Sequence, residues 1–241
     1  MTAGDTRGTR ADASRASGLG ITRDEMLARI RDSLDAGRSS KPEPPSINQD
    51  IARLIAQRED LVSVFAANAQ AGGMLVQRLR ESDLESAVAE GLRTADARTV
   101  SVACDNSPLT DVVVKACERE RIRVIRPDSG LGFDPHYEAK IGVTDVDCAV
   151  AETGSLVISS TATRGRAPYL VPPIHFAIVP ASKIVADLLD VWSVLRVDRI
   201  VENHSAVVLV SGPSKTGDIE GVLVTGVHGP GEVRVLLVED L

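Results

Sequence analysis

Aromatic side chains are scarce in this sequence, and basic residues are outnumbered. Phe, Trp and Tyr make up 2% of the 241 residues, and 34 acidic against 27 basic residues give a net charge of −7. A protein that binds nucleic acid needs basic surface to release counterions, and single-stranded bases also need aromatic rings to stack on. We therefore expect no nucleic acid partner.

Cysteine pairs, histidine pairs and long apolar runs are also missing. Cys104, Cys117 and Cys148 stand apart without C-x-x-C spacing, which argues against a disulfide framework or a cysteine-ligated cluster in this chain. No two histidines have metal-ligand spacing, and no apolar run approaches the roughly 18 residues of a membrane span. The N-terminus has no apolar signal segment. These absences predict a cytoplasmic protein with no membrane span, metal or cofactor of its own.

The sequence divides into three predicted segments. They are a disordered tail (1–20), an N-terminal helix with a proline-rich linker (21–48), and an α/β domain (49–241). Low apolar content predicts the tail, and the prolines at 42, 44 and 45 predict an extended linker. Between them, Thr22 and Glu25 form a capping box ahead of Leu27, Ile30 and Leu34 at helical spacing, which predicts a short amphipathic arm.

Alternating strands and helices predict the fold class of the remaining chain. One predicted helix ends at Gly72-Gly73, a second begins at the capping box Ser82–Glu85, and a third covers 111–120. Strands are predicted at 99–103 and 122–125. This alternation is typical of a parallel sheet. Two later strands, 146–150 and 156–158, are only a few residues apart and must be antiparallel. Further strands at 175–179, 206–210 and 233–238 and a helix at 182–195 complete a mixed open sheet flanked by helices.

The turn between the two close strands is the first candidate site. Glu152-Thr153-Gly154-Ser155 places a carboxylate at a sheet end among small and apolar neighbours, where Glu152 could act as a general base or nucleophile. Thr153, Gly154 and Ser155 would bring the backbone close to a ligand. The alternative is an ordinary tight turn with a solvated Glu152.

A second candidate site follows the strand at 206–210. It offers backbone N–H groups, hydroxyls and an ammonium group that could hold a small anion. Its residues are Ser211, Gly212, Ser214, Lys215, Thr216, Asp218 and Glu220. The spacing is not that of a P-loop, because Gly212 is the only glycine before the lysine. The alternative is a turn capped by Ser or Thr.

Two arginines and two histidines complete the candidates. Arg164 and Arg166 lie in a loop of small residues and prolines, where they could clamp a carboxylate or phosphate or simply be solvated. His228, beside Gly229-Pro230, is the acid–base candidate, with a turn residue as its alternative. His175 begins an apolar strand and is predicted to be a core residue.

Three of these elements, taken in order, resemble the lactate-utilisation protein C family. They are the Glu-Thr-Gly of residues 152–154, the Ser-Gly-Pro-Ser of 211–214 and the His-Gly-Pro of 228–230, and the likeness covers most of the chain. It implies a lactate-utilisation domain, similar in fold to ribose-5-phosphate isomerase, CoA transferases and 5-formyltetrahydrofolate cyclo-ligase. It also implies a role in oxidising L-lactate to pyruvate with cysteine-rich and iron–sulfur partner proteins, which would hold the clusters.

Two hypotheses follow about function. In the first, the chain is a non-redox component of a lactate-oxidising system and binds a small anion through the two candidate loops. In the second, it is an independent enzyme, similar to a CoA transferase or a cyclo-ligase, with Glu152 as base or nucleophile and Lys215 holding an anionic substrate. The comparison with CoA transferases is an analogy at the level of the fold.

Overall fold

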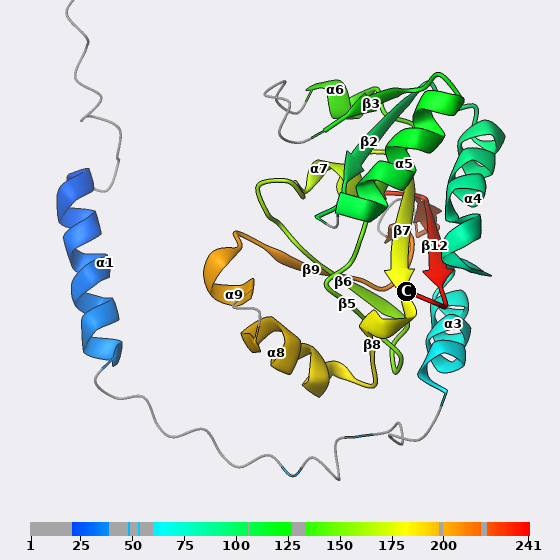
Figure 1. Cartoon of the computed structure of the whole chain (residues 1–241). Coiled ribbons are helices and arrows are strands. Elements are labelled where there is room, and N and C mark those ends of the chain that lie inside the picture. The colour runs from blue at the N-terminus through cyan, green and yellow to red at the C-terminus, as the bar shows by residue number, and fades with distance from the viewer. Residues whose placement is uncertain are drawn as a thin grey trace, which may run out of the picture. The chain divides into compact units, whose positions relative to one another are not determined.

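The computed structural model divides the chain into two units, Met1–Gln49 and Asp50–Leu241 (Figure 1). The residues described are 21–38, 48, 53, 60–105, 107–126, 134–197, 200–217 and 221–241. The predicted tail (1–20) and most of the proline-rich linker lie outside these residues. So do most of the segment 50–59 and the candidate residues Asp218 and Glu220.

The first unit contains helix α1, Arg23–Arg38. The predicted capping box is confirmed, since the backbone N of Thr22 donates to Glu25 Oε2 at 2.7 Å and Thr22 Oγ1 accepts from the backbone N of Glu25 at 3.3 Å. These bonds satisfy N–H groups that a helix start leaves without partners. The apolar residues Met26, Ile30 and Leu34 are 49%, 45% and 59% exposed.

The second unit is built on a six-stranded sheet in the order β1-β12-β7-β4-β2-β3. Every neighbouring pair in it is parallel. Its strands are β1 Leu75–Leu79, β2 Thr99–Ala103, β3 Arg123–Ile125, β4 Ile141–Thr144, β7 Ile174–Pro180 and β12 Glu232–Val238. The prediction of a parallel sheet from alternating strands and helices is confirmed.

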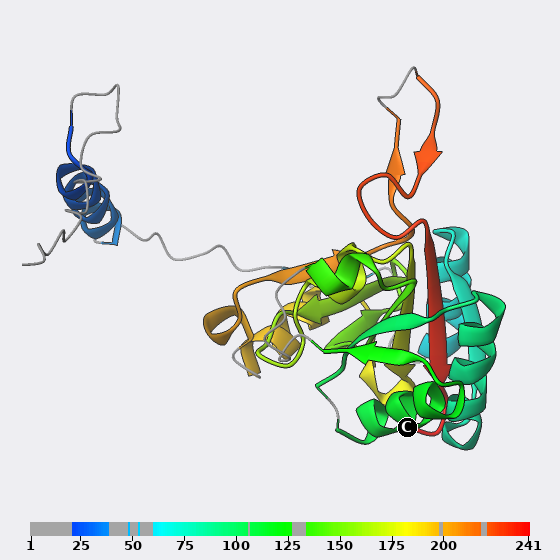
Figure 2. The same ribbon diagram turned by 90° about the horizontal axis from the view of Figure 1, so that it is seen from above.

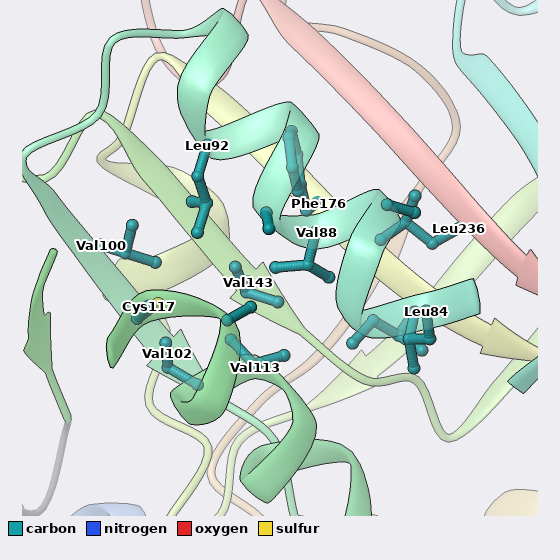
Figure 3. Packing of buried hydrophobic residues seen from close by; sticks show 14 of the residues in the cluster. Leu84, Val88, Leu92, Val100, Val102, Val113, Cys117, Val143, Phe176 and Leu236 are labelled. Carbon is teal, nitrogen blue, oxygen red and sulfur yellow. The ribbon is translucent and has the colours of Figure 1, made fainter. Parts of the chain in front are cut away.

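Two helices, α4 (Glu81–Thr94) and α5 (Ser107–Arg119), cover one face of this sheet. Helix α4 presents Leu84, Val88 and Leu92 at a spacing of four residues, and all three are fully buried. Figure 3 shows them packed against Phe176 and other strand residues. Burying a side chain of this size stabilises the fold by about 1.5–3 kcal/mol, so this stripe holds the helix in place.

The other face of the sheet packs on helix α3 (Leu61–Ala71) and on a four-stranded sheet in the order β8-β5-β6-β9. The strands are β5 Cys148–Val150, β6 Ser155–Ser159, β8 Ile184–Val185 and β9 Val207–Val210. The predicted antiparallel pairing of β5 with β6 is confirmed. Helices α8 (Leu188–Val197) and α9 (Ile200–Asn203) cover the outer face of this second sheet. The mixed α/β architecture is therefore arranged as two sheets between helices.

Short elements complete the unit. They are α6 Asp134–Tyr137, α7 Ala167–Leu170, a 3-10 helix Ala181–Lys183, β10 Lys215–Thr216 and β11 Val224–Thr225. Figure 2 shows that the β10–β11 hairpin projects away from the two sheets.

Three predicted helix starts were wrong, and one is that of α5, which begins at Ser107 and not at residue 111. Two other starts also differ. The helix predicted from residue 182 begins only at Leu188 as α8, because residues 182 and 183 end a short 3-10 helix and Ile184 and Val185 pair with β5 as strand β8. Helix α4 begins at Glu81, before the predicted capping box, and its N-cap residue Arg80 makes no side-chain capping bond. In both places tertiary contacts override the local pattern.

Across the described part of the chain, no helix is both long enough and apolar enough to cross a membrane.

Candidate functional site

The turn that carries Glu152 is held against helix α3. Asn68 Nδ2 donates hydrogen bonds to the carbonyl oxygens of Ala151 and Glu152, at 2.8 and 3.0 Å. Gly154 has a φ of 65°, and a Cβ there would lie 2.2 Å from the backbone N of Ala69. The glycine is therefore required for close packing on the helix, a contact that no local sequence pattern indicates.

A chain of hydroxyl groups connects the two candidate loops. Thr153 Oγ1 donates to Ser155 Oγ at 2.8 Å, and Ser155 Oγ is 2.7 Å from Ser211 Oγ. Ser155 is buried and the other two are exposed, so the chain runs across the surface of the site. The carboxylate of Glu152, which is half-buried, has no hydrogen-bond or ion-pair partner among the described residues. The structure thus brings Glu152, Thr153, Ser155 and Ser211 together.

The Ser211 loop also lies at the C-terminal end of α3. The carbonyl oxygen of Ser211 is 3.0 Å from the position that a Cβ on Gly72 would take, and Lys215 Nζ is 3.5 Å from the corresponding position on Gly73. A helix C-terminus carries partial negative charge, which a nearby ammonium group stabilises. The ammonium group of Lys215 therefore lies where it can interact with this end of the helix, in addition to the role in anion binding that the sequence predicts.

The loop of His228 meets the Ser211 loop at the amino ends of two central strands. The backbone N of Ser214 donates to Pro230 O at 2.8 Å, and the backbone N of Gly231 donates to Pro173 O at 3.0 Å. Pro173 and Gly231 immediately precede β7 and β12. His228 itself is exposed. The three sequence elements that were grouped by their order thus lie side by side in space.

The remaining candidates are placed differently. Arg166 is the N-cap residue of α7, is exposed, and has no hydrogen bond or ion pair within the described residues. Helix α7 packs on β4 and β2, and within the described residues no hydrogen bond or ion pair joins Arg166 to the two candidate loops. Thr216 pairs with Val224 in the projecting hairpin.

Arg164 lies in a buried charge network that the sequence reading missed. Its side chain is 2% exposed, so the prediction of a ligand clamp or a solvated cation was wrong. Nη1 donates to Asp145 Oδ1 at 2.9 Å, Nη2 to Asp147 Oδ1, and Nε to Ser159 O at 2.8 Å. Burial opposes the charge of Arg164, but the carboxylates of Asp147 and Asp145 outweigh it and raise the pKa above its ordinary value.

The exposed end of this network is Asp105. Its carboxylate lies 3.6 Å from Arg164 Nη2 and accepts hydrogen bonds from the hydroxyls of Thr161 and Thr163. Asp105 and Asp145 follow the carboxyl ends of β2 and β4, the edge where open α/β sheets commonly bind ligands. The sequence does contain a feature that indicates such a network, namely the two acidic residues at 145 and 147 beside an apolar strand. Buried carboxylates need a counter-charge, which points to a buried basic residue nearby.

His175 is buried in the sheet, as its position in an apolar strand predicted. Its Nε2 lies 2.9 Å from Thr144 Oγ1, and its Nδ1 has no hydrogen-bond partner among the described residues. Burial lowers the pKa of His175 to about 4, so the imidazole is neutral at physiological pH. A neutral, enclosed ring fits the predicted core role.

Comparison with known proteins supplies the family. The LUD domain model matches residues 135–238. A lactate utilization protein C from Halalkalibacterium halodurans is 30% identical over 187 residues, which cover 76% of this chain and 80% of that protein. The chain belongs to the lactate utilization protein C family.

Other family members match over shorter stretches. The proteins of that name from Bacillus licheniformis and Bacillus subtilis are 38% and 36% identical over 106 and 105 residues. In both cases the matched stretch covers 43% of this chain and 44% of the relative, so this chain spans less than half the length of those two relatives. A crystal structure of a DUF162 family protein from Deinococcus radiodurans has a TM-score of 0.58 at 22% identity and covers 76% of this chain and 99% of its own. That likeness confirms the fold.

The matched LUD segment contains most, but not all, of the residues of two groups, the joined loops of Glu152 and Ser211 and the charge network of Arg164. Glu152, Ser211 and the Arg164 network centre lie inside residues 135–238. Asn68 and Asp105, which complete the two groups, lie outside it. In this lactate utilization protein C family member, segments outside the match are therefore needed to complete both groups.

The three cysteines of this family member are buried and free. Burial raises the pKa of the Cys104 thiol above its usual range and that of Cys117 to about 11. Cys117 belongs to α5 and lies in the core cluster that α4 and α5 form with the six-stranded sheet, whereas Cys148 lies in the cluster under α8. Within the described residues, no group of three or more His, Cys, Asp or Glu side chains is arranged to hold a metal ion.

Proposed function

We propose that this protein is a non-redox component of a system that oxidises L-lactate to pyruvate, acting in the cytoplasm with iron–sulfur and cysteine-rich partner proteins. Membership of the lactate utilization protein C family is the observation that carries the proposal. Its thiols support it, because an iron–sulfur cluster is commonly held by four cysteine thiolates, and this chain has three cysteines, which are buried apart. The clusters that accept electrons from lactate would then belong to the partners.

The part we assign to this chain is the binding of a small anion at the two joined loops. The hydrogen bond between Ser155 and Ser211 fixes these loops together, and Lys215 supplies positive charge beside them. Hydroxyl groups with one ammonium group suit a carboxylate or a phosphate. The nearby carboxylate of Glu152 would accept a hydrogen bond from a hydroxyl group of the same ligand.

Reconstitution of lactate-dependent electron transfer tests the first part. We expect the partner proteins to reduce an artificial electron acceptor with L-lactate when this chain is present, and to lose that activity when it is omitted. The chain should also co-purify with the partners. Undiminished activity without this chain, and undiminished growth of a deletion strain on lactate, would contradict the proposal.

Ligand binding tests the second part. A thermal-shift screen of small carboxylates and phosphates should find a compound that stabilises the full chain by about 2.7 kcal/mol at 100 times its Kd. The variants Ser211→Ala and Lys215→Met should lose this stabilisation. Lys183→Met is the matched control, because Lys183 is also an exposed lysine but lies on the 3-10 helix after β7. If Lys183→Met loses the ligand-induced stabilisation to the same extent, the ligand does not bind at the proposed site.

One observation favours the second candidate function, an independent enzyme acting on an acyl, phosphosugar or folate-like substrate. The backbone of Glu152 is fixed by Asn68 while its carboxylate makes no hydrogen bond within the described residues, an arrangement that suits a general base or nucleophile. Turnover of such a substrate by the chain alone, abolished in Glu152→Gln, would support this function. Turnover that survives Glu152→Gln would exclude Glu152 from the mechanism.

A further inference from the structure

An apolar groove of about 330 Å³ lies between helix α8 and strand β9. It is lined by Leu188, Val191, Trp192, Leu195, Val207 and Leu209. Trp192, the only tryptophan of the chain, is 57% exposed, and Leu209 is 46% exposed. Contiguous apolar surface of this kind on a protein commonly marks a binding site for another apolar surface.

The shape of the groove suits a helix. Its α8 wall consists of residues 188, 191, 192 and 195, a helical spacing that forms one continuous face about 10 Å long. Its other wall, β9, pairs with β6 and is one of the two edge strands of the four-stranded sheet. An amphipathic helix can lay its apolar stripe into such a trough.

The chain itself carries a helix of that kind. The exposed residues Met26, Ile30 and Leu34 of α1 follow one another at a spacing of four, which gives a stripe about 12 Å long, close to the length of the groove. A single helix of this size is marginal in water without a packing surface. The α1 stripe and the α8–β9 groove are therefore complementary apolar surfaces.

The chain that leads to α1 is anchored beside the groove. Arg53 donates to Asp187 Oδ2 at 3.0 Å and to Asp190 Oδ1 at 2.8 Å, and these acidic residues lie at the start of α8. The segment between Arg38 and Arg53 can span up to about 50 Å. Its prolines at 42, 44 and 45 favour an extended backbone, which presents a helix at a distance from its anchor.

We propose that the α8–β9 groove of one copy of this protein holds helix α1 of a second copy. The exchange is reciprocal, so a two-fold symmetric dimer fills two grooves with two helices. Met26, Ile30 and Leu34 of the incoming helix cover Trp192 and Leu209. The segment that the sequence predicts to be a proline-rich linker, anchored at Arg53 next to the groove, would carry each helix to the partner.

Trp192 reports on this contact in the full-length chain. We expect the wild-type chain to have the mass of a dimer by light scattering, with blue-shifted Trp192 emission that acrylamide quenches weakly. Ile30→Glu puts a charge on the stripe and should give a monomer with red-shifted, strongly quenched emission. Ala28→Glu adds the same charge on the opposite face of α1 and should behave as the wild type. Circular dichroism checks that both variants are folded.

Mixing two variants tests delivery from a second copy. Ile30→Glu keeps an intact groove, and Leu209→Glu keeps an intact helix but places a charge in the groove. Each alone should be monomeric, and the mixture should form dimers with partial recovery of the blue shift. The proposal is overturned if the mixture shows no recovery, if Ala28→Glu matches Ile30→Glu, or if the wild-type chain is a monomer at all concentrations, whether or not its Trp192 is shielded.

Discussion

Replacing Arg164 with methionine should strongly destabilise this protein. The guanidinium group is 2% exposed and bonds Asp145 at 2.9 Å, Asp147, and both the carbonyl and the hydroxyl oxygens of Ser159 at 2.8 Å. Methionine fills much of the same volume, so the change mainly removes the positive charge and its hydrogen bonds. Removing one partner of a buried ion pair costs about 3–5 kcal/mol, a large share of the about 5–15 kcal/mol that stabilises an ordinary domain.

Urea titration followed by circular dichroism measures this loss as a change in unfolding free energy. Arg166→Met is the matched control, since that arginine is exposed and makes no bond in the described structure, and it should change the unfolding free energy by no more than about 0.5 kcal/mol. Asp145→Asn and Asp147→Asn, added to Arg164→Met, should restore part of the loss because they remove the uncompensated charges. A loss below about 1 kcal/mol for Arg164→Met would refute the reasoning.

Three further measurements test other parts of the fold. The pKa of His175 falls from 6.5 to about 4 on folding, so stability that is complete above pH 6.5 should decrease by about 3 kcal/mol as the pH approaches 4. Chemical unfolding at both pH values should show a smaller decrease in His175→Gln. Gly154→Ala should lower the melting temperature, because its Cβ would collide with the backbone of Ala69, whereas Gly217→Ala, with nothing within 4 Å, should not. Thiol reagents should leave buried Cys117 unmodified at pH 8 until the chain is unfolded.

Local sequence patterns predicted the class of fold because residues close together in the sequence largely determine whether a segment forms a helix or a strand. The alternation of predicted strands and helices indicated a parallel sheet, and the short gap between β5 and β6 required an antiparallel pair. Ile184 and Val185 were misassigned because a two-residue strand is defined by its partner β5 and leaves little periodic signal. The order of the strands depends on contacts between distant residues, and the sequence pattern carries no information on it.

The candidate site was predicted in part for the same reason. The order of the sequence elements grouped Ser155, Ser211 and His228, and the structure places their loops together. It did not indicate Asn68, whose amide secures the Glu152 turn from a helix more than eighty residues away. Nor did composition reveal the burial of Arg164, because a charged residue in a loop of small residues is usually solvated.

The position of β12 has a consequence for the synthesis of this protein. This strand lies between β1 and β7 in the sheet. Strand β1, at the edge of the sheet, can pair only after β12 has been synthesised, because Leu75 pairs with Arg234. At ordinary translation rates the ribosome takes on the order of 10 s to make the intervening chain. Until β12 has been made, the backbone edges of β1 and β7 that pair with it have no partner strand. Unpaired strand edges favour aggregation, so a chaperone that binds nascent chains should associate with this protein until residue 238 has emerged.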